Sequence, residues 1–189
     1  MASSDTQTKE IEITPTMTME EILGAYPSAK RALFQKFHIG GCQSCGYSLQ
    51  DTLEEVLTKH NRAGQMTEAV EQIYESARVD EAMQINPAEF KRELEENGDQ
   101  WKILDVRQPW EASIVKLPNS ELLTQELAYE MMQKWPRDQK ILMYCHTGIR
   151  SLEATSYFLG HGLTNVKSLK GGIDRWAVDV DPSLPRYGK

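Results

Sequence analysis

The sequence predicts an α/β domain, with a mainly parallel sheet flanked by helices, preceded by a small all-helical domain. Up to about residue 80, each segment with apolar residues at helical spacing is followed by another segment of the same kind. After residue 80, strand-like and helix-like segments alternate, which is typical of a parallel sheet covered on both faces. The apolar run 140–144 leads directly into Cys145 and then into a helical pattern, which predicts a strand, a tight loop and a helix.

Composition excludes several classes of protein. The chain has 189 residues, 40% of them hydrophobic and 26% charged, as in ordinary globular proteins. Its net charge of −7 gives no general attraction for nucleic acid or an anionic membrane surface, so local donors must hold any anionic substrate. Three cysteines do not make a secreted disulfide framework. We found neither a signal-peptide core nor a stretch near eighteen apolar residues, and therefore expect a cytoplasmic protein that does not cross a membrane.

The pattern divides the chain into a flexible tail (1–15), a helical Cys-x-x-Cys domain (16–64), a helical connector (65–80) and the α/β domain (81–189). In the helical domain, Thr18 opens a short helix through a capping-box pattern, Ser28 caps a helix over 29–37, and Ser48 starts a helix that ends near residue 60. In the α/β domain, the expected strands are 102–106, 114–117, 140–144 and 166–169. The expected helices are 87–96, 121–135, one after Cys145 that ends at Gly160, and one opening at Gly171, before a proline-broken coil from 181.

Cys145 occupies the position that makes a cysteine most reactive. It follows a buried strand and precedes a helix N-terminus, where unpaired backbone N–H groups and the helix dipole stabilise a thiolate. The thiolate is the nucleophilic form of cysteine. The alternative is an inert core cysteine, which we disfavour because such a residue requires neither Gly148 nor Arg150.

The size of the loop indicates the substrate. Cys145 to Arg150 makes six residues, few enough for the loop N–H groups to converge on the cysteine sulfur. Protein tyrosine and dual-specificity phosphatases use a loop one residue longer, which fits a tetrahedral phosphate or arsenate. The shorter loop favours a sulfur atom, and leaves a phosphatase or arsenate reductase as a weaker alternative.

The second half of the chain resembles the rhodanese family of sulfurtransferases. The marks of this resemblance are Leu104-Asp-Val-Arg107 with Glu111, the loop from Tyr144 to Ser151, and Leu169-Lys-Gly-Gly-Ile-Asp-Arg-Trp176. One departure lies at Lys116-Leu-Pro-Asn119, where the family usually has His-Ile-Pro-Gly, and this change alters the rim of the site.

The resemblance implies a rhodanese-like fold and transfer of a sulfane sulfur through a persulfide on Cys145. A donor such as thiosulfate would be bound by Arg150 and by loop residues His146, Thr147, Gly148 and Ile149, with His146 serving as a loop residue rather than a base. The sulfur acceptor would be a thiol or a protein, and no cofactor or metal is implied. Asp105 and Arg107 mostly brace the loops near the site in this family.

The first 64 residues resemble a redox-disulfide domain associated with hybrid-cluster proteins, and the N-terminal domain of iron–sulfur cluster repair proteins. The matching features are Ile22 to Pro27, the glycine-flanked pair Cys42 and Cys45, and Ser48 to Glu55. The resemblance implies a redox pair. Two alternatives stay open, namely a zinc site made by His38, Cys42, Cys45 and His60, and a pair that remains reduced and idle.

We therefore expect a sulfurtransferase or a persulfide carrier. The competing hypothesis is a redox or metal-sensing interaction module, in which the α/β domain presents Cys145 to a partner. We further hypothesise that the persulfide passes from Cys145 to the Cys42 and Cys45 pair, the other thiols of the chain.

Overall fold

The computed structural model describes residues 11–40 and 46–188. The chain divides into two compact units, residues 1–80 and 81–189. Cys42 and Cys45 lie outside the described residues, so the predicted redox pair and its zinc alternative keep the status of hypotheses.

The N-terminal unit is helical, as predicted, and its helices enclose one apolar core. They are α1 (Met19–Ala25), α2 (Ala29–Phe37), α3 (Leu53–Lys59), the short 3₁₀ helix η1 (Ala63–Gln65) and α4 (Met66–Ala82). The segment that we expected as a connector belongs to α4, and its Ala69 and Ile73 are fully buried in this core. Arg31 of α2 pairs with Asp80 and donates a 3.0 Å hydrogen bond to Ser76 Oγ, which fixes the last turns of α4 against α2.

Helices α1 and α3 begin in the same way. Thr18 and Thr52 each accept a hydrogen bond from the backbone N–H of the glutamate three residues later, and each glutamate accepts one in return, which completes two capping boxes. An antiparallel bridge joins the two threonines. The third helix thus starts at Leu53 and not at Ser48, because Ser48 instead forms a turn in which its hydroxyl accepts from the Gln50 N–H at 3.2 Å. The Ser28 side chain likewise makes no cap hydrogen bond to α2.

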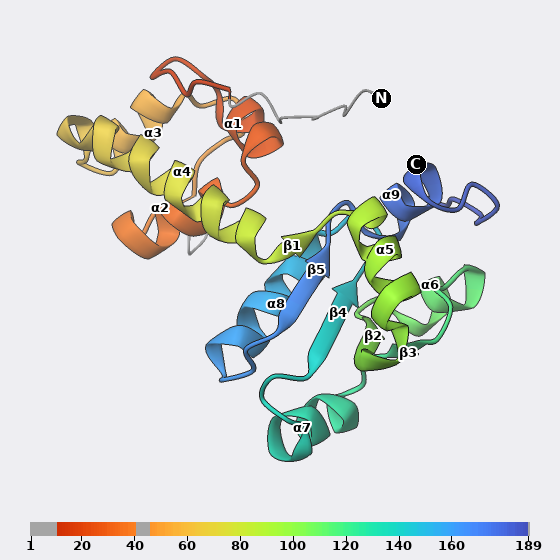
Figure 1. Ribbon diagram of the computed structural model, residues 1–189. Helices are drawn as coiled ribbons and strands as arrows, with labels where there is room; N and C mark the ends of the chain where they lie inside the picture. The colour runs from red at the N-terminus through yellow and green to blue at the C-terminus, as the bar shows by residue number, and fades with distance from the viewer. Residues whose placement is uncertain (1–10, 41–45, 189) are drawn as a thin grey trace. The chain divides into compact units, whose positions relative to one another are not determined.

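The C-terminal unit contains a five-stranded parallel sheet, which confirms the predicted fold class (Figure 1). Its strands are β1 (Gln84–Ile85), β2 (Trp101–Asp105), β3 (Ser120–Leu122), β4 (Lys140–Tyr144) and β5 (Val166–Leu169), in the spatial order β1-β5-β4-β2-β3. In the central pair, Asp105 lies opposite Tyr144, so the segments that follow β2 and β4 leave the sheet at the same edge. Open α/β sheets form their sites at this carboxyl edge.

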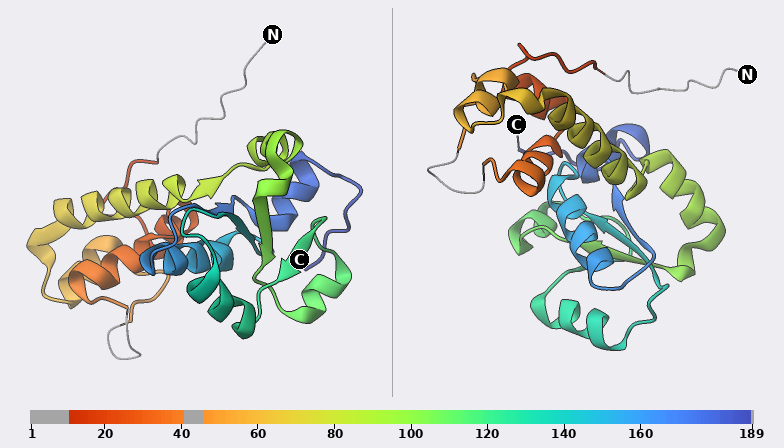
Figure 2. Two further views of the ribbon diagram at one scale, coloured as in Figure 1. Left: turned by 60° about the horizontal axis from the view of Figure 1, so that its bottom comes forward. Right: turned by 90° about the vertical axis from the view of Figure 1, so that its left-hand side faces the viewer.

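Helices cover both faces of the sheet (Figures 1 and 2). They are α5 (Pro87–Asn97), α6 (Pro109–Ile114), α7 (Gln125–Lys134), α8 (Ile149–Gly160) and α9 (Gly172–Asp179), with a 3₁₀ turn η2 at Gly98–Gln100. Along β4, Leu142 and Tyr144 pack in the cluster formed with α5 and α9, whereas Ile141 and Met143 pack in the cluster formed with α7 and α8. This burial on two faces explains why β4 reads as a continuous apolar run rather than an alternating one.

The region between β2 and α7 differs from the prediction. Residues 114–117, predicted as a strand, are the end of α6 and an irregular segment, and the third strand is Ser120–Leu122. Helix α6 forms because Gln108 and Glu111 make a capping box with proline at the first helical position. The next helix begins at Gln125 rather than at residue 121, since Thr124 accepts a hydrogen bond from the Leu127 N–H at 3.1 Å.

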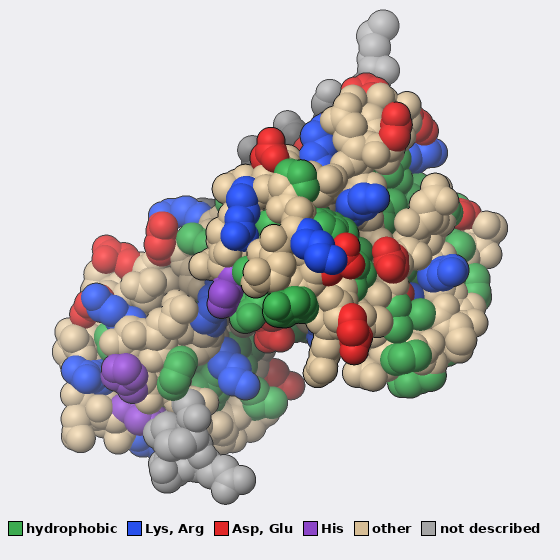
Figure 3. Space-filling model, turned by 90° about the horizontal axis from the view of Figure 1, so that it is seen from below, with side chains coloured by type: hydrophobic (Ala, Val, Ile, Leu, Met, Phe, Trp, Pro, Cys, Tyr) green, Lys and Arg blue, Asp and Glu red, His purple; other side chains and the backbone are tan. Residues whose placement is uncertain are grey.

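Charge is dispersed over the face of the molecule seen in Figure 3, where Lys and Arg side chains lie among Asp and Glu side chains. Within residues 11–40 and 46–188, no helix has the length and apolar character needed to cross a membrane.

Candidate functional site

Cys145 lies directly after β4, in the loop that leads into α8. The residue is 1% exposed, and its sulfur accepts a hydrogen bond from the Gly148 N–H at 3.1 Å. The Ser151 hydroxyl, on the first turn of α8, lies 3.6 Å from the same sulfur. The strand, loop and helix predicted around Cys145 are present, and the sulfur sits among N–H and O–H donors rather than in an apolar core.

The first turn of α9 holds the backbone of the cysteine loop. The Ile173 and Asp174 N–H groups donate to the carbonyls of Cys145 and His146 at 2.9 and 3.1 Å. Gly172 has a φ of +62°, and a Cβ atom there would lie 2.5 Å from the Cys145 carbonyl oxygen. Only glycine fits between the turn and the loop at this position. The Gly171-Gly172 pair is therefore part of the site, although it lies far from Cys145 in the sequence.

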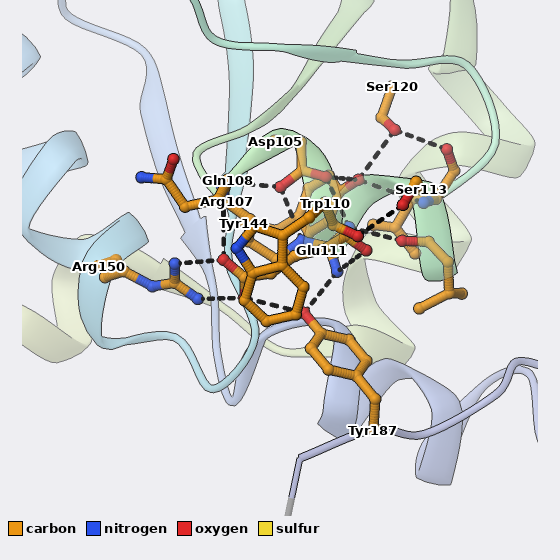
Figure 4. A network of polar contacts seen from close by, with 12 residues as sticks. Asp105, Arg107, Gln108, Trp110, Glu111, Ser113, Ser120, Tyr144, Arg150 and Tyr187 are labelled. Atoms are coloured by element: carbon orange, nitrogen blue, oxygen red, sulfur yellow. Dashed lines mark hydrogen bonds and ion pairs between the residues drawn. The ribbon is translucent and has the colours of Figure 1, made fainter.

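Arg150 does not point at the Cys145 sulfur as a free cation, because it forms a two-point ion pair with Glu111 of α6 (Figure 4). Its Nη1 and Nη2 atoms each lie 2.7 Å from a Glu111 carboxylate oxygen. The hydrogen bonds from Arg150 lower the pKa of Glu111 to about 2, against the opposing effect of burial. The same pair raises the pKa of Arg150, so both groups are ionised at neutral pH.

Asp105 and Arg107 form a second ion pair, which is more deeply buried than the first. Arg107 donates to both Asp105 oxygens, at 2.8 and 2.6 Å, and to the Val115 carbonyl at 2.6 Å. Burial lowers the pKa of Arg107, but the hydrogen bonds to Asp105 and Tyr187 outweigh it and the pKa is raised. The Tyr144 hydroxyl also donates a hydrogen bond to Asp105, at 2.9 Å. Both side chains of this pair are almost completely buried and do not face solvent.

The remaining loop residues lie at the surface or near it. Thr147 and Ile149 are exposed, and His146 is half-buried, with its ring stacked on that of Tyr187 at a centroid distance of 4.3 Å. The structure thus brings His146, Gly148 and Arg150 to one edge of the sheet with Asp105 and Arg107, the edge at which Cys145 lies.

Two residues of the site received no role in the prediction. Glu111 appeared only as a mark of the family resemblance, and Tyr187 lay in a segment read as coil. The capping-box spacing of Gln108 and Glu111 was a signal for a helix there, but nothing in the spacing identified Arg150 as the partner of Glu111. Tyr187 carries no local signal at all, because its partners Arg107 and Glu111 lie 80 and 76 residues earlier.

Of the four residues in the zinc hypothesis, His38 and His60 lie in the part of the chain that the structure describes, whereas Cys42 and Cys45 do not. His38 is exposed, and His60 Nδ1 lies 2.8 Å from the Val56 carbonyl oxygen. Among these described residues, no group of three His, Cys, Asp or Glu side chains is arranged to hold a metal ion.

Comparison with known proteins identifies the domain. The model of the rhodanese-like domain family matches residues 86–179. The chain is similar to a sulfurtransferase of Allochromatium vinosum, with 33% identity over 75 residues that cover 40% of this chain and 70% of that protein. It is also similar to the thiosulfate sulfurtransferase GlpE of Vibrio cholerae, with 30% identity over 74 residues that cover 39% of this chain and 70% of that protein.

A longer relative matches only in part. The probable adenylyltransferase/sulfurtransferase MoeZ of Mycobacterium tuberculosis is 31% identical over 115 residues, which cover 60% of this chain but 29% of that protein. This chain thus spans less than a third of the length of that relative. The family match falls on the unit that contains the parallel sheet and the cysteine loop, and the chain belongs to the family of rhodanese-like domains.

Proposed function

We propose that the chain is a sulfurtransferase or persulfide carrier in which Cys145 accepts a sulfane sulfur. The observation that carries this proposal is the Cys145 sulfur held at 3.1 Å from the Gly148 N–H, in a six-residue loop that leads into α8. Relatives named sulfurtransferase support transfer of sulfur in general, and the name of the Vibrio cholerae relative supports thiosulfate as the donor.

The reaction begins with attack of the Cys145 thiolate on the outer sulfur of thiosulfate. An S–S bond forms to Cys145, the S–S bond of thiosulfate breaks, and sulfite leaves with the bonding electron pair. The product is an anionic persulfide on Cys145. A nucleophilic acceptor, such as a thiolate or cyanide, then attacks the outer sulfur and restores the Cys145 thiolate.

The loop provides donors for the negative charge at each stage. The first N–H groups of α8 have no partner within the helix, and they begin at Ile149, next to the Gly148 N–H that already contacts the sulfur. Preformed donors stabilise a persulfide or a departing sulfite without reorganisation during the reaction. A thiolate and fixed donors are sufficient for sulfur transfer, so the mechanism assigns no acid or base role to His146.

The pairing with Glu111 limits how many N–H donors of Arg150 can contact a substrate. Two of its N–H groups are directed at Glu111, and a guanidinium has five such donors. Its side chain is 43% exposed, so its remaining donors are accessible to an anion at the rim of the loop. We propose that Arg150 contacts the donor from this fixed orientation, whereas the buried Arg107 and Asp105 act only through the backbone that they hold.

Turnover of thiosulfate with cyanide tests the proposal. The wild type should form thiocyanate and Cys145→Ser should form none, while both proteins keep the same thermal unfolding midpoint. Sulfur loading without turnover would favour a carrier over an enzyme. Hydrolysis of an aryl phosphate at a rate comparable to sulfur transfer would contradict the argument from loop size.

A further inference from the structure

We propose that Tyr187 is a positioning residue of this site, whose hydroxyl joins the Asp105–Arg107 pair to the Glu111–Arg150 pair and so fixes the orientation of Arg150. The effect of Tyr187 on sulfur loading rests on the proposed function, whereas its effect on the orientation of Arg150 does not. No role for Tyr187 follows from the sequence, since the residue lies in the coil after the last helix.

The segment that carries Tyr187 is attached to the domain at several points. Arg186 donates to both carboxylate oxygens of Asp174 in α9, at 2.7 and 2.9 Å. Leu184 and the Tyr187 ring pack against the cluster formed by α5, α9 and the sheet. These contacts hold the segment beside the cysteine loop, where Figure 4 shows the Tyr187 ring directed at the ion pairs.

The Tyr187 hydroxyl has one donor partner and one acceptor partner, both charged. Arg107 Nη1 donates to it at 2.7 Å, and the hydroxyl donates to Glu111 Oε1 at 3.1 Å. These directions are fixed, because a guanidinium can only donate and the ionised Glu111 can only accept. Burial raises the pKa of Tyr187, so the hydroxyl keeps the proton that this arrangement requires.

The hydroxyl completes the set of donors around Glu111. Besides Tyr187, the carboxylate accepts from the Gln108 N–H at 3.0 Å and from both Nη atoms of Arg150 at 2.7 Å. Glu111 is a buried residue, so its carboxylate relies on these contacts rather than on water for its orientation. The position of Arg150 beside the loop depends in turn on the orientation of this carboxylate.

The ring of Tyr187 makes separate contacts. It stacks on His146 at an interplanar angle of 13°, and forms a T-shaped pair with Trp110 at a centroid distance of 6.4 Å. A phenylalanine retains both ring contacts. Tyr187→Phe therefore removes the link between the side chains of the two ion pairs, while it leaves the ring packing and the 3.4 Å hydrogen bond from Arg107 Nη1 to the Glu111 carbonyl oxygen in place.

Hydrogen exchange of the Arg150 guanidinium, measured by nuclear magnetic resonance on the full chain, tests the inference without any sulfur chemistry. Tyr187→Phe should accelerate exchange of the Arg150 side-chain N–H groups by about three- to tenfold, the range for loss of a coupling of roughly 1 kcal/mol. Tyr129→Phe makes the same chemical change at a tyrosine that is 70% exposed in α7, and should have no effect. Unchanged exchange in Tyr187→Phe would overturn the inference.

A second measurement, of sulfur loading, distinguishes a positioning role of Tyr187 from a general structural role. Tyr187→Phe should raise the thiosulfate concentration for half-maximal loading of Cys145 by about three- to tenfold, and by less than about twofold when Arg150 is already alanine. The same factor in both backgrounds would show that Tyr187 does not act through Arg150. A wild type that loads no sulfur would end the proposed function, while the exchange measurement would still decide the role of Tyr187.

Discussion

Arg150 and Glu111 are joined by two parallel hydrogen bonds of 2.7 Å, from a cysteine loop to a helix that lies 39 residues earlier in the chain. The Glu111 side chain is 5% exposed and that of Arg150 is 43% exposed. The ion pair of Arg150 and Glu111 thus adds no net charge beside the loop, since the carboxylate balances the guanidinium. If the proposed function holds, the attraction of an anionic donor to this site depends on the loop N–H groups and on the free edge of a fixed guanidinium.

Removal of Arg150 should therefore do more than remove one donor. In Arg150→Ala, the buried Glu111 carboxylate loses its partner, and its charge repels an anionic donor from the loop. We expect loading of Cys145 by thiosulfate to weaken by at least about 1.5–3 kcal/mol, the range for loss of one charged hydrogen bond.

The double variant Arg150→Ala, Glu111→Gln separates these two effects. Because it removes the unpaired charge, its loading should recover by a measurable factor relative to Arg150→Ala alone. Concentration series of thiosulfate, read by intact mass, give both values. Equal loading of the single and double variants would show that the Glu111 charge does not act on the donor.

Acid should weaken the folded state through Glu111. Its pKa is lowered from an ordinary value of 4.5 to about 2, so the ion pair contributes its full stability above about pH 4.5 and loses it as the pH falls towards 2. The contribution should be about 1–3 kcal/mol, reduced from the full shift because Arg150 is partly exposed to screening solvent.

Urea unfolding between pH 2 and 7 measures this effect. Glu111→Gln should show a shallower loss of unfolding free energy below pH 4.5 than the wild type. Glu130→Gln is the matched control, because Glu130 is half-exposed and its contact with Lys134 is 3.9 Å long. Identical pH profiles for the wild type and Glu111→Gln would contradict the pKa assigned to the pair.

Gly172→Ala should distort the cysteine loop. The added Cβ would overlap the Cys145 carbonyl oxygen, at a backbone φ of +62° that is itself strained for alanine. Loading of Cys145 should fall by at least about tenfold, as expected for a shift of roughly an ångström at a reacting group. Gly160→Ala, at a position where a Cβ meets nothing within 4 Å, should load sulfur as the wild type does. A Gly172→Ala protein with wild-type loading would show that the turn does not hold the loop.

The sequence was most informative where structure is local. The strand, loop and helix around Cys145 follow from an apolar run and a helical pattern that adjoin each other, and both were predicted. The apolar residues of 114–117 misled the prediction, since Val115 and Leu117 are buried without forming a strand. The Gln108, Pro109 and Glu111 pattern was the better signal, because a capping box is itself a local feature.

The contacts that orient the site were beyond such reasoning. The ion pair of Glu111 with Arg150 joins the segments that follow β2 and β4. The hydrogen bonds of Tyr187 with Arg107 and Glu111 join the C-terminal segment to the one after β2. Spacing within one segment carries no information about these pairs. The local structure around Cys145 could thus be predicted, whereas the restraint on Arg150 could not.

The hypothesis of a relay to Cys42 and Cys45 makes a separate prediction. One thiolate of the pair attacks the outer sulfur of the Cys145 persulfide and becomes a persulfide itself. The second thiolate then attacks the inner sulfur of this new persulfide, closing a disulfide and releasing hydrosulfide. Sulfur-loaded protein without added thiol should release sulfide as a Cys42–Cys45 disulfide appears in peptide mapping. Cys42→Ser should stop both. A Cys145 persulfide that survives beside reduced, metal-free Cys42 and Cys45 would rule out the relay, and stoichiometric zinc at these cysteines would replace it.

The central claim is that Cys145 itself takes up the sulfur. The direct measurement is the intact mass of the protein after incubation with thiosulfate, followed by peptide mapping of the added mass. We expect one additional sulfur atom, located on Cys145, in the wild type immediately after loading and, stably, in Cys42→Ser, in which the relay is blocked, and no addition in Cys145→Ser. Equal labelling of the wild type and Cys145→Ser, or no labelling of either, would contradict the account.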